Sequence, residues 1–184
     1  MQILILSDSH LRNENVFSIL NHHPNIKTII HCGDVGKEIQ FDPSYQVYLV
    51  KGNNDFLDYP LEIETKIDQK RFFITHGHLY QVDFNYEQLE KKAKENQIDV
   101  VCFGHTHDPI CYQKENILFI NPGSVSFPRG NHVFVPTYCI LDENQVHFYH
   151  AKTFENIDHV VYQQKSEKTS FLKRLLQKKA NTHK

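Results

Sequence analysis

The chain has 184 residues, of which 40% are hydrophobic, and its formal net charge at pH 7 is −2. This length is ordinary for one domain and this hydrophobic content suffices for a sizeable core, so no second domain is required. No run approaches the roughly 20 apolar residues that span a bilayer, and no basic leader or apolar signal core precedes the first apolar run, so we exclude a membrane protein and expect a cytoplasmic one.

The first half of the chain alternates between predicted strands and helices. Apolar, β-rich runs predict strands at residues 3–6, 28–30, 47–50, 72–74 and 100–103. Between the first two runs, Val16, Ile19 and Leu20 form an apolar stripe at helical spacing, with Asn13 as the expected N-cap. This segment therefore predicts a βαβ unit.

A second surface helix is predicted at residues 86–96. Leu89 and Ala93 fall on one of its faces and several charged residues on the other. After Pro109 the pattern changes to short β runs at residues 117–120, 138–141 and 146–149, separated by turn residues. We therefore expect a mostly antiparallel second half.

The C-terminal tail, residues 165–184, differs from the preceding body in charge. It has seven Lys or Arg and one acid, Glu167, whereas residues 1–164 carry a net charge of −8. Four apolar residues of the tail lie at helical spacing: Phe171, Leu172, Leu175 and Leu176. We expect a domain over residues 1–164 and a basic amphipathic helix after it, which docks on its own domain or on another copy in a homodimer or higher homo-oligomer.

Six short polar clusters punctuate the first two thirds of the chain, five of them directly after the predicted strands of the first half. They are Asp8-Ser9-His10, Gly33-Asp34, Gly52-Asn53-Asn54-Asp55, Thr75-His76-Gly77-His78, Gly104-His105-Thr106-His107 and Asn121-Pro122-Gly123-Ser124. Two divalent cations about 3.5–4 Å apart repel each other and need anionic oxygens and imidazoles around them. Seven residues supply such a set: Asp8, His10, Asp34, Asn53, His76, His105 and His107. Strand ends meet at one edge of an open α/β sheet, so the clusters predict a two-metal hydrolase.

The series D-x-H, G-D, G-N-x-D, H-G-H and G-H-x-H, in this order, resembles the calcineurin-like metallophosphoesterase superfamily. Within it, the small size, the G-N-N-D variant and the N-P-G-S segment resemble the compact bacterial and archaeal phosphodiesterases of the YfcE type. The resemblance spans roughly residues 1–126. It implies an α/β (α+β) fold, a single-domain four-layer αββα sandwich in which helices flank two mixed β-sheets.

The resemblance also implies a ligand assignment. Asp8, His10 and His107 would hold one metal ion, Asn53, His76 and His105 the other, and Asp34 would bridge the two. A hydroxide bridging the two ions would then attack phosphorus in line, without a protein nucleophile. This mixture of ligands suits Mn²⁺, Fe²⁺, Co²⁺, Ni²⁺ or Zn²⁺ better than Mg²⁺ or Ca²⁺, and the resemblance favours manganese.

Asn54 departs from a pattern common in this superfamily, where a histidine often stands in its place. Asn54 can donate a hydrogen bond in catalysis but cannot protonate a leaving group, which favours leaving groups of low basicity. The chain has only four arginines, which argues against a protein phosphatase, because such an enzyme needs nearby arginines to bind its phosphomonoester substrate. We therefore expect a small phosphodiester as the substrate. His78 stays unassigned between a proton donor and a residue that orients a ligand.

Each of these residues also has an ordinary structural interpretation. An isolated Asp8, His10 or Asp34 is more often a turn former or helix cap than a ligand, but seven such residues together reverse that expectation. Asp55 is expected to cap a turn, and Arg129 to lie on the surface. For the segment from Asn121 to Ser124, a tight turn and a loop bordering the site are equally favoured.

Three alternatives to the phosphodiesterase remain. A non-catalytic scaffold, such as the retromer subunit of this fold, predicts eroded ligands, which this chain does not have. A phosphomonoesterase is the second alternative. A nuclease acting on long nucleic acid would call for an extended basic track, whereas the positive charge here is concentrated in the tail. The four cysteines, Cys32, Cys102, Cys111 and Cys139, show no C-x-x-C spacing and are expected to be reduced and mostly buried.

Overall fold

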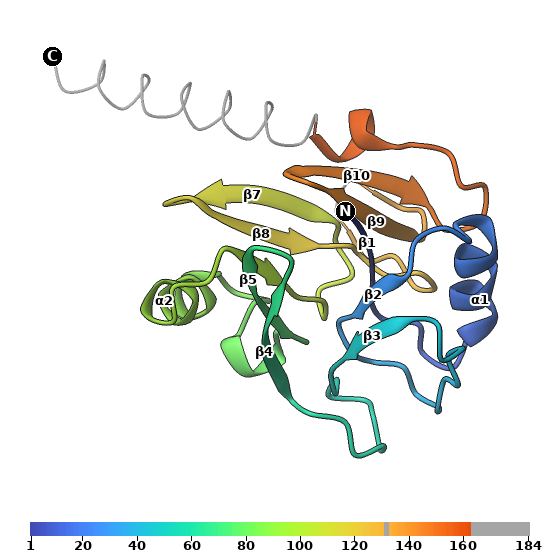
Figure 1. Cartoon of the computed structure of the whole chain (residues 1–184), viewed down its shortest axis with the longest axis horizontal. Helices are drawn as coiled ribbons and strands as arrows, with labels where there is room; N and C mark the ends of the chain where they lie inside the picture. The colour runs from blue at the N-terminus through green and yellow to red at the C-terminus, as the bar shows by residue number, and fades with distance from the viewer. Residues whose placement is uncertain (131–132, 163–184) are drawn as a thin grey trace, which may run out of the picture.

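The computed structural model of the chain describes residues 1–130 and 133–162, and the predicted C-terminal helix at residues 165–184 lies outside this part. Two five-stranded sheets form the centre of the molecule (Figure 1). The first sheet contains β1 (Gln2–Leu6), β2 (Thr28–His31), β3 (Gln46–Leu49), β9 (Thr137–Asp142) and β10 (Gln145–His150). The second contains β4 (Glu62–Ile67), β5 (Lys70–Thr75), β6 (Val100–Cys102), β7 (Ile110–Lys114) and β8 (Ile117–Asn121).

Both sheets are mixed. In the first, with strand order β10-β9-β1-β2-β3, β1 pairs in parallel with β2 and antiparallel with β9. In the second, with strand order β4-β5-β6-β8-β7, the central strands β5, β6 and β8 are parallel and the two edge strands are antiparallel to their neighbours. The strands of the second half of the chain thus enter both sheets.

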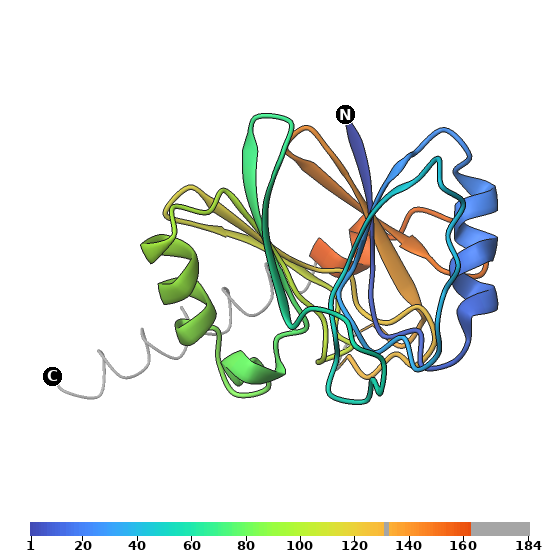
Figure 2. The ribbon, with the colours of Figure 1, turned by 60° about the horizontal axis from the view of Figure 1, so that its bottom comes forward.

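Helices cover the two outer faces of this pair of sheets (Figure 2). The helix α1 (Asn13–His22) packs on the first sheet, where Val16 and Ile19 belong to the same buried apolar cluster as Leu4 and Leu6. The helix α2 (Glu87–Glu95) and the 3₁₀ turn η1 (His78–Tyr80) lie on the side of the second sheet. The largest apolar cluster fills the space between the sheets. The four-layer αββα sandwich is therefore confirmed.

The local reasons for these elements are visible in their burial. Residues 3–6 of β1 are all buried, because neighbouring layers cover both faces of this sheet. On α2, Leu89 and Ala93 are buried, as the apolar stripe predicts. The expected N-cap role of Asn13 is wrong. Arg12 holds the cap position, while Asn13 is the first residue of the helix and is buried, and its Nδ2 donates to the carbonyl of Lys37 at 3.1 Å.

Two strands were absent from the sequence prediction, and a third is displaced by one residue. β4 and β7 are edge strands with few fully buried residues, so neither forms a continuous apolar run. β3 spans Gln46–Leu49 rather than residues 47–50. No disulfide joins the four cysteines among the described residues, and three of them are buried.

The sheet topology brings the polar clusters to one end of the sandwich. β1, β2 and β3 run in the same direction, as do β5, β6 and β8, and the loops that follow them gather at the lower edge in Figure 2, away from the N-terminus. Among the described residues, no helix has both the length and the apolar character needed to cross a membrane.

Candidate metal centre

The residues predicted as metal ligands lie in loops that follow β1, β2, β3, β5 and β6. Five of the seven have a left-handed backbone: Asp8 (φ 55°), His10 (φ 45°), Asp34 (φ 56°), His105 (φ 71°) and His107 (φ 58°). Residues other than glycine rarely adopt this conformation, which costs about 1–3 kcal/mol each and concentrates at functional sites. The surrounding structure must therefore hold these loops in place.

The first group of ligands surrounds the carboxylate of Asp8. Its Oδ1 lies 3.0 Å from Nε2 of His107 and 3.7 Å from Nε2 of His10, and the two imidazole nitrogens are 3.1 Å apart. Asp8 is fully buried, and its Oδ1 accepts no hydrogen bond from the described residues. Burial raises the pKa of Asp8, but the interaction with His107 and the charge of His76 outweigh it, so the pKa is lowered overall.

The hydrogen bonds behind the histidine rings determine which nitrogen faces the site. Nδ1 of His107 lies 2.5 Å from the carbonyl oxygen of Phe127, and Nδ1 of His76 lies 2.7 Å from that of Cys32. Because a carbonyl can only accept, each Nδ1 carries a hydrogen, and Nε2 is the ring atom that faces the carboxylates and could bind a metal ion. This is the arrangement by which proteins orient histidines that bind a metal.

The second group of ligands surrounds His76. Its Nε2 lies 3.5 Å from Oδ2 of Asp34, 3.1 Å from Oδ1 of Asn53 and 4.0 Å from Oδ1 of Asp8. Asp34 Oδ2 is also 3.7 Å from Nε2 of His10, so this carboxylate lies between the two groups. Two sets of three ligand atoms can be defined here, and within each set all three atoms lie within 4.8 Å of one another. One set comes from Asp8, His10 and His107, and the other from Asp8, Asp34 and His76.

These two sets fit divalent cations. Lone pairs of imidazoles and oxygens of carboxylates converge here, and the buried Asp8 Oδ1 has no hydrogen-bond donor among the described residues. A cation would supply the positive charge that such a set of acceptors needs. The roles of the individual ligands stay predictions, including the bridging role of Asp34.

Asn54 donates two hydrogen bonds to the carboxylate of Asp34. Its main-chain N–H donates to Oδ1 at 2.8 Å, and its side-chain Nδ2 donates to Oδ2 at 2.6 Å. Burial raises the pKa of Asp34, but His76 and these two hydrogen bonds outweigh it and hold the pKa well below its usual range. Asp34 is therefore ionised at neutral pH.

His105 reaches the cluster in a different way. Its ring centroid lies 5.2 Å from that of His76, and its main-chain N–H donates to Oδ2 of Asp8 at 3.2 Å. Its Nε2 is 2.6 Å from Oδ2 of Asp83, so this nitrogen carries the hydrogen and Nδ1 is the atom left for a metal. Asp83 belongs to none of the sequence motifs, and its only signal is that it is an acidic residue in the loop after the H-G-H cluster.

Two residues outside the ligand set hold the ligand loops together. Asp55 accepts main-chain hydrogen bonds from Asp34, Gly36 and Gly52, at 2.7–2.8 Å, which confirms its structural role. Ser124 donates through Oγ to the carbonyl of Asp8 at 2.8 Å.

Asn121 likewise holds the loop that follows β6 in place. Its Nδ2 donates to the carbonyl of Gly104 at 2.8 Å. The segment from Asn121 to Ser124 is therefore more than a tight turn, because it borders the site and fastens two of its loops.

Two glycines of the motifs are required for space. A Cβ at Gly52 would overlap the carboxylate of Asp34, and a Cβ at Gly104 would overlap Oγ of Ser7 and approach Oδ2 of Asp8. The glycines therefore let the backbone come close enough for the carboxylates to take their places.

Three further residues lie near the site. Arg12 places its guanidinium carbon 4.4 Å from the ring centroid of Phe127. Burial lowers the pKa of His10. Arg129 is exposed, as expected. His78 has a ring centroid 5.4 Å from that of His76, and its buried Nδ1 has no hydrogen-bond partner among the described residues.

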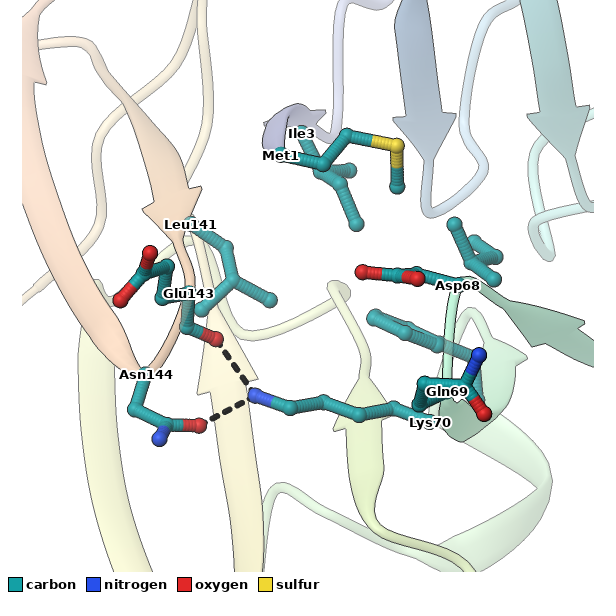
Figure 3. A pocket seen from close by; sticks show the side chains of 10 residues that line it. Met1, Ile3, Asp68, Gln69, Lys70, Leu141, Glu143 and Asn144 are labelled. Carbon is teal, nitrogen blue, oxygen red and sulfur yellow. Dashed lines mark hydrogen bonds between the residues drawn. The ribbon is translucent and has the colours of Figure 1, made fainter.

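A separate pocket of about 280 Å³ lies at the other end of the sandwich (Figure 3). Met1, Ile3 and Asp68 are among the residues that line it, and Lys70 donates there to the carbonyl of Glu143 at 2.5 Å. Its lining includes no histidine or cysteine. This pocket therefore lacks the imidazole and thiolate ligands that the loop end of the sandwich offers.

Comparisons with known proteins agree with this geometry. The family model of the calcineurin-like phosphoesterase superfamily domain matches residues 1–146. The chain is 35% identical over 156 residues to the probable metallophosphoesterase YsnB of Bacillus subtilis (strain 168), which covers 81% of this chain and 90% of that protein. It is 33% identical over 164 residues to the phosphodiesterase MJ0936 of Methanocaldococcus jannaschii, which covers 77% and 93%. The crystal structure of a predicted phosphoesterase from Streptococcus pneumoniae TIGR4 matches with a TM-score of 0.76 and 30% identity, covering 85% and 92%.

Proposed function

Because this chain belongs to the calcineurin-like phosphoesterase superfamily, we propose that it is a metal-dependent phosphodiesterase with a dinuclear centre. The reaction is the addition of water to a small phosphodiester, which breaks one P–O bond and releases an alcohol and a phosphomonoester. The relative MJ0936, which is named a phosphodiesterase, supports this choice.

One observation carries the proposal: two sets of ligand atoms share Asp8, and the Asp34 carboxylate lies between His10 and His76. Two divalent cations, when bound, would acidify a water molecule and offset the negative charge of the phosphoryl oxygens. Asp8, His10 and His107 are the residues proposed for one cation, and Asn53, His76 and His105 for the other. Asp34 is proposed to contact both.

The residues around the ligands favour diesters with good leaving groups. Asn54, which occupies the place of a histidine in many relatives, donates both of its hydrogen bonds to Asp34 and has no proton to transfer. His78 is the nearest candidate for a proton donor, because its ring lies 5.4 Å from that of His76. A leaving group that departs without protonation needs no such donor.

We propose manganese as the native metal. The ligand set of imidazoles, carboxylates and one amide suits Mn²⁺ and also Fe²⁺, Co²⁺, Ni²⁺ and Zn²⁺. The metal that restores the highest activity to stripped protein would rank these ions.

The test is hydrolysis of bis(p-nitrophenyl) phosphate beside p-nitrophenyl phosphate by metal-stripped protein, with Mn²⁺, Ni²⁺, Zn²⁺ or Mg²⁺ added back in turn. We expect metal-restored cleavage of the diester, loss of that cleavage in Asp34→Asn, and little change in Asp68→Asn. The Asp68 variant is a matched control, because this exposed aspartate lies in the pocket at the other end of the sandwich.

Two results would overturn the proposal. If Asp34→Asn bound two metal ions and stayed active, the bridging assignment would be wrong. If no metal restored activity on either ester while the protein stayed folded, the non-catalytic scaffold would become the better reading of the same fold.

A further inference from the structure

Phe127 forms a partly exposed platform at the edge of the candidate metal centre. The centroid of its ring lies 5.6 Å from that of His10, with the two rings nearly perpendicular. The guanidinium of Arg12 lies over the ring, 4.4 Å from its centroid. Although it makes both contacts, Phe127 remains 38% exposed, so part of its apolar surface is open to a ligand.

The main chain fixes this ring relative to the metal ligands. The N–H of Phe127 donates to Oγ of Ser124 at 2.8 Å, and its carbonyl accepts from Nδ1 of His107 at 2.5 Å. Ser124 in turn donates to the carbonyl of Asp8. Phe127 therefore cannot move without disturbing the loops of two predicted ligands, and its distance from the site is set by the fold.

Exposed phenylalanines gather around this end of the molecule. Among the described residues five phenylalanines are exposed. Three of them, Phe56, Phe84 and Phe127, adjoin or contact residues of the site, and a fourth, Phe134, lies in the loop before β9. Phe56 follows Asp55, and Phe84 follows Asp83, so each adjoins a residue that holds a ligand or a ligand loop. The fifth, Phe17, lies on α1. An apolar rim around a charged site is typical of a binding site whose ligand is both anionic and partly apolar.

We propose that Phe127 and Arg12 form a subsite for the ester group that stays on phosphorus, and that this group is a flat aromatic ring such as an aryl group or a nucleobase. The ring of the substrate stacks on Phe127, and the guanidinium of Arg12 attracts the phosphodiester anion beside it. This inference rests on the proposed function, because it names the class of diester that the centre hydrolyses.

The test compares two diesters with the same leaving group. Bis(p-nitrophenyl) phosphate and methyl p-nitrophenyl phosphate both release p-nitrophenolate, and only the retained group changes from a ring to a methyl group. In manganese-loaded protein, Phe127→Leu should lower the ratio of the two kcat/KM values, aryl over methyl, by roughly five- to tenfold. Phe127→Tyr, which keeps the ring, should preserve the ratio, as should Phe17→Leu, which removes an equally exposed phenylalanine from α1.

A binding measurement on the unmodified protein gives a second readout. Calorimetry should show that phenylphosphonate binds the manganese-loaded protein more tightly than methylphosphonate does, and that Phe127→Leu removes most of this difference. An unchanged kcat/KM ratio in Phe127→Leu, or equal affinities for the two phosphonates, would overturn the subsite and leave the phosphodiesterase intact. Failure of the unmodified protein to cleave either diester with any metal would overturn the proposed function, and this inference with it.

Discussion

Asn54 holds Asp34 by both of its donors, with the main-chain N–H on one carboxylate oxygen and the side-chain amide on the other. The residue that lacks a transferable proton is therefore also the residue that orients the carboxylate between the two ligand groups. A side chain at this position has two tasks, and a substitution can separate them.

Replacing Asn54 with histidine would introduce a proton donor beside the phosphoryl group. We expect Asn54→His to raise kcat/KM for alkyl leaving groups relative to p-nitrophenolate, because a poor leaving group gains most from protonation. Absolute rates should fall, since the bond from Asn54 Nδ2 to Asp34 is lost. The measurement is a series of aryl and alkyl phosphodiesters, and a leaving-group dependence identical to that of the unmodified protein would contradict the prediction.

Replacing Asp83 with asparagine should weaken metal binding without unfolding the protein. The Asp83 carboxylate is 2.6 Å from Nε2 of His105 and half exposed, so its loss changes the basicity and orientation of that ring rather than the core. We expect Asp83→Asn to bind one of two Mn²⁺ ions about 10–100-fold more weakly. Isothermal titration of Mn²⁺ into Asp83→Asn and the unmodified protein, with Asp68→Asn as the control, would check this. If Asp83→Asn bound both ions as tightly as the unmodified protein does, the prediction would be wrong.

Replacing Gly52 with alanine should disrupt the site by steric overlap alone. A Cβ at this position overlaps the carboxylate and main-chain nitrogen of Asp34, so the Asp34 loop must shift. We expect a loss of about 1–3 kcal/mol in the free energy of unfolding and a metal content below one ion per chain. Elemental analysis together with urea unfolding measures both quantities. Full metal loading of Gly52→Ala would show that the loop tolerates the shift.

Replacing His31 with leucine should reduce the acid sensitivity of the metal-free protein. His31 is fully buried in β2, and neither ring nitrogen has a hydrogen-bond partner among the described residues. Burial lowers its pKa from 6.5 to about 4. Below the unfolded pKa only the unfolded chain takes up a proton, until the pH falls through the folded pKa, so stability decreases across this interval.

The size of this effect follows from the interval. Between its unfolded pKa of 6.5 and about pH 5, His31 should remove about 2 kcal/mol from the free energy of unfolding. Urea unfolding of the chelator-treated proteins at the two pH values should therefore show a smaller decrease for His31→Leu by that amount. The same decrease in both proteins would contradict the prediction.

Much of the fold could be predicted because most of its central strands contain a run of buried apolar residues. Residues 3–6 and 28–30 lie in a sheet with both faces covered, so their apolar runs predicted two strands clearly. The apolar stripe between them predicted the helix α1. β4 was missed although Glu62, Glu64 and Lys66 alternate with less polar residues, because an edge strand needs no apolar run. The prediction that Asn13 caps the helix was wrong because its side chain is buried and hydrogen-bonds to Ser9 and Lys37 instead.

The ligand set could be predicted as a set, because its members stand at strand ends and strand ends share an edge. What supports the ligands could not. Asp83 is 22 residues from His105, and Phe127 is 20 residues from His107, so both contacts depend on the paths of intervening loops that carry no periodic pattern. The left-handed backbone of Asp8 and Asp34 likewise lies in loops held between distant segments, because Asp55 accepts from the N–H of Asp34 and Ser124 donates to the carbonyl of Asp8.

The bond between Ser124 and Asp8 joins residues that are 116 positions apart. A growing chain leaves the ribosome N-terminus first, so Asp8 emerges long before the residue that fastens its loop. β9, which covers the second edge of β1, emerges later still. A nascent chain that has reached His107 already carries all seven predicted ligands, yet it lacks the parts that arrange the first of them. The predicted metal centre can therefore take its shape only after Ser124 and β9 have been synthesised.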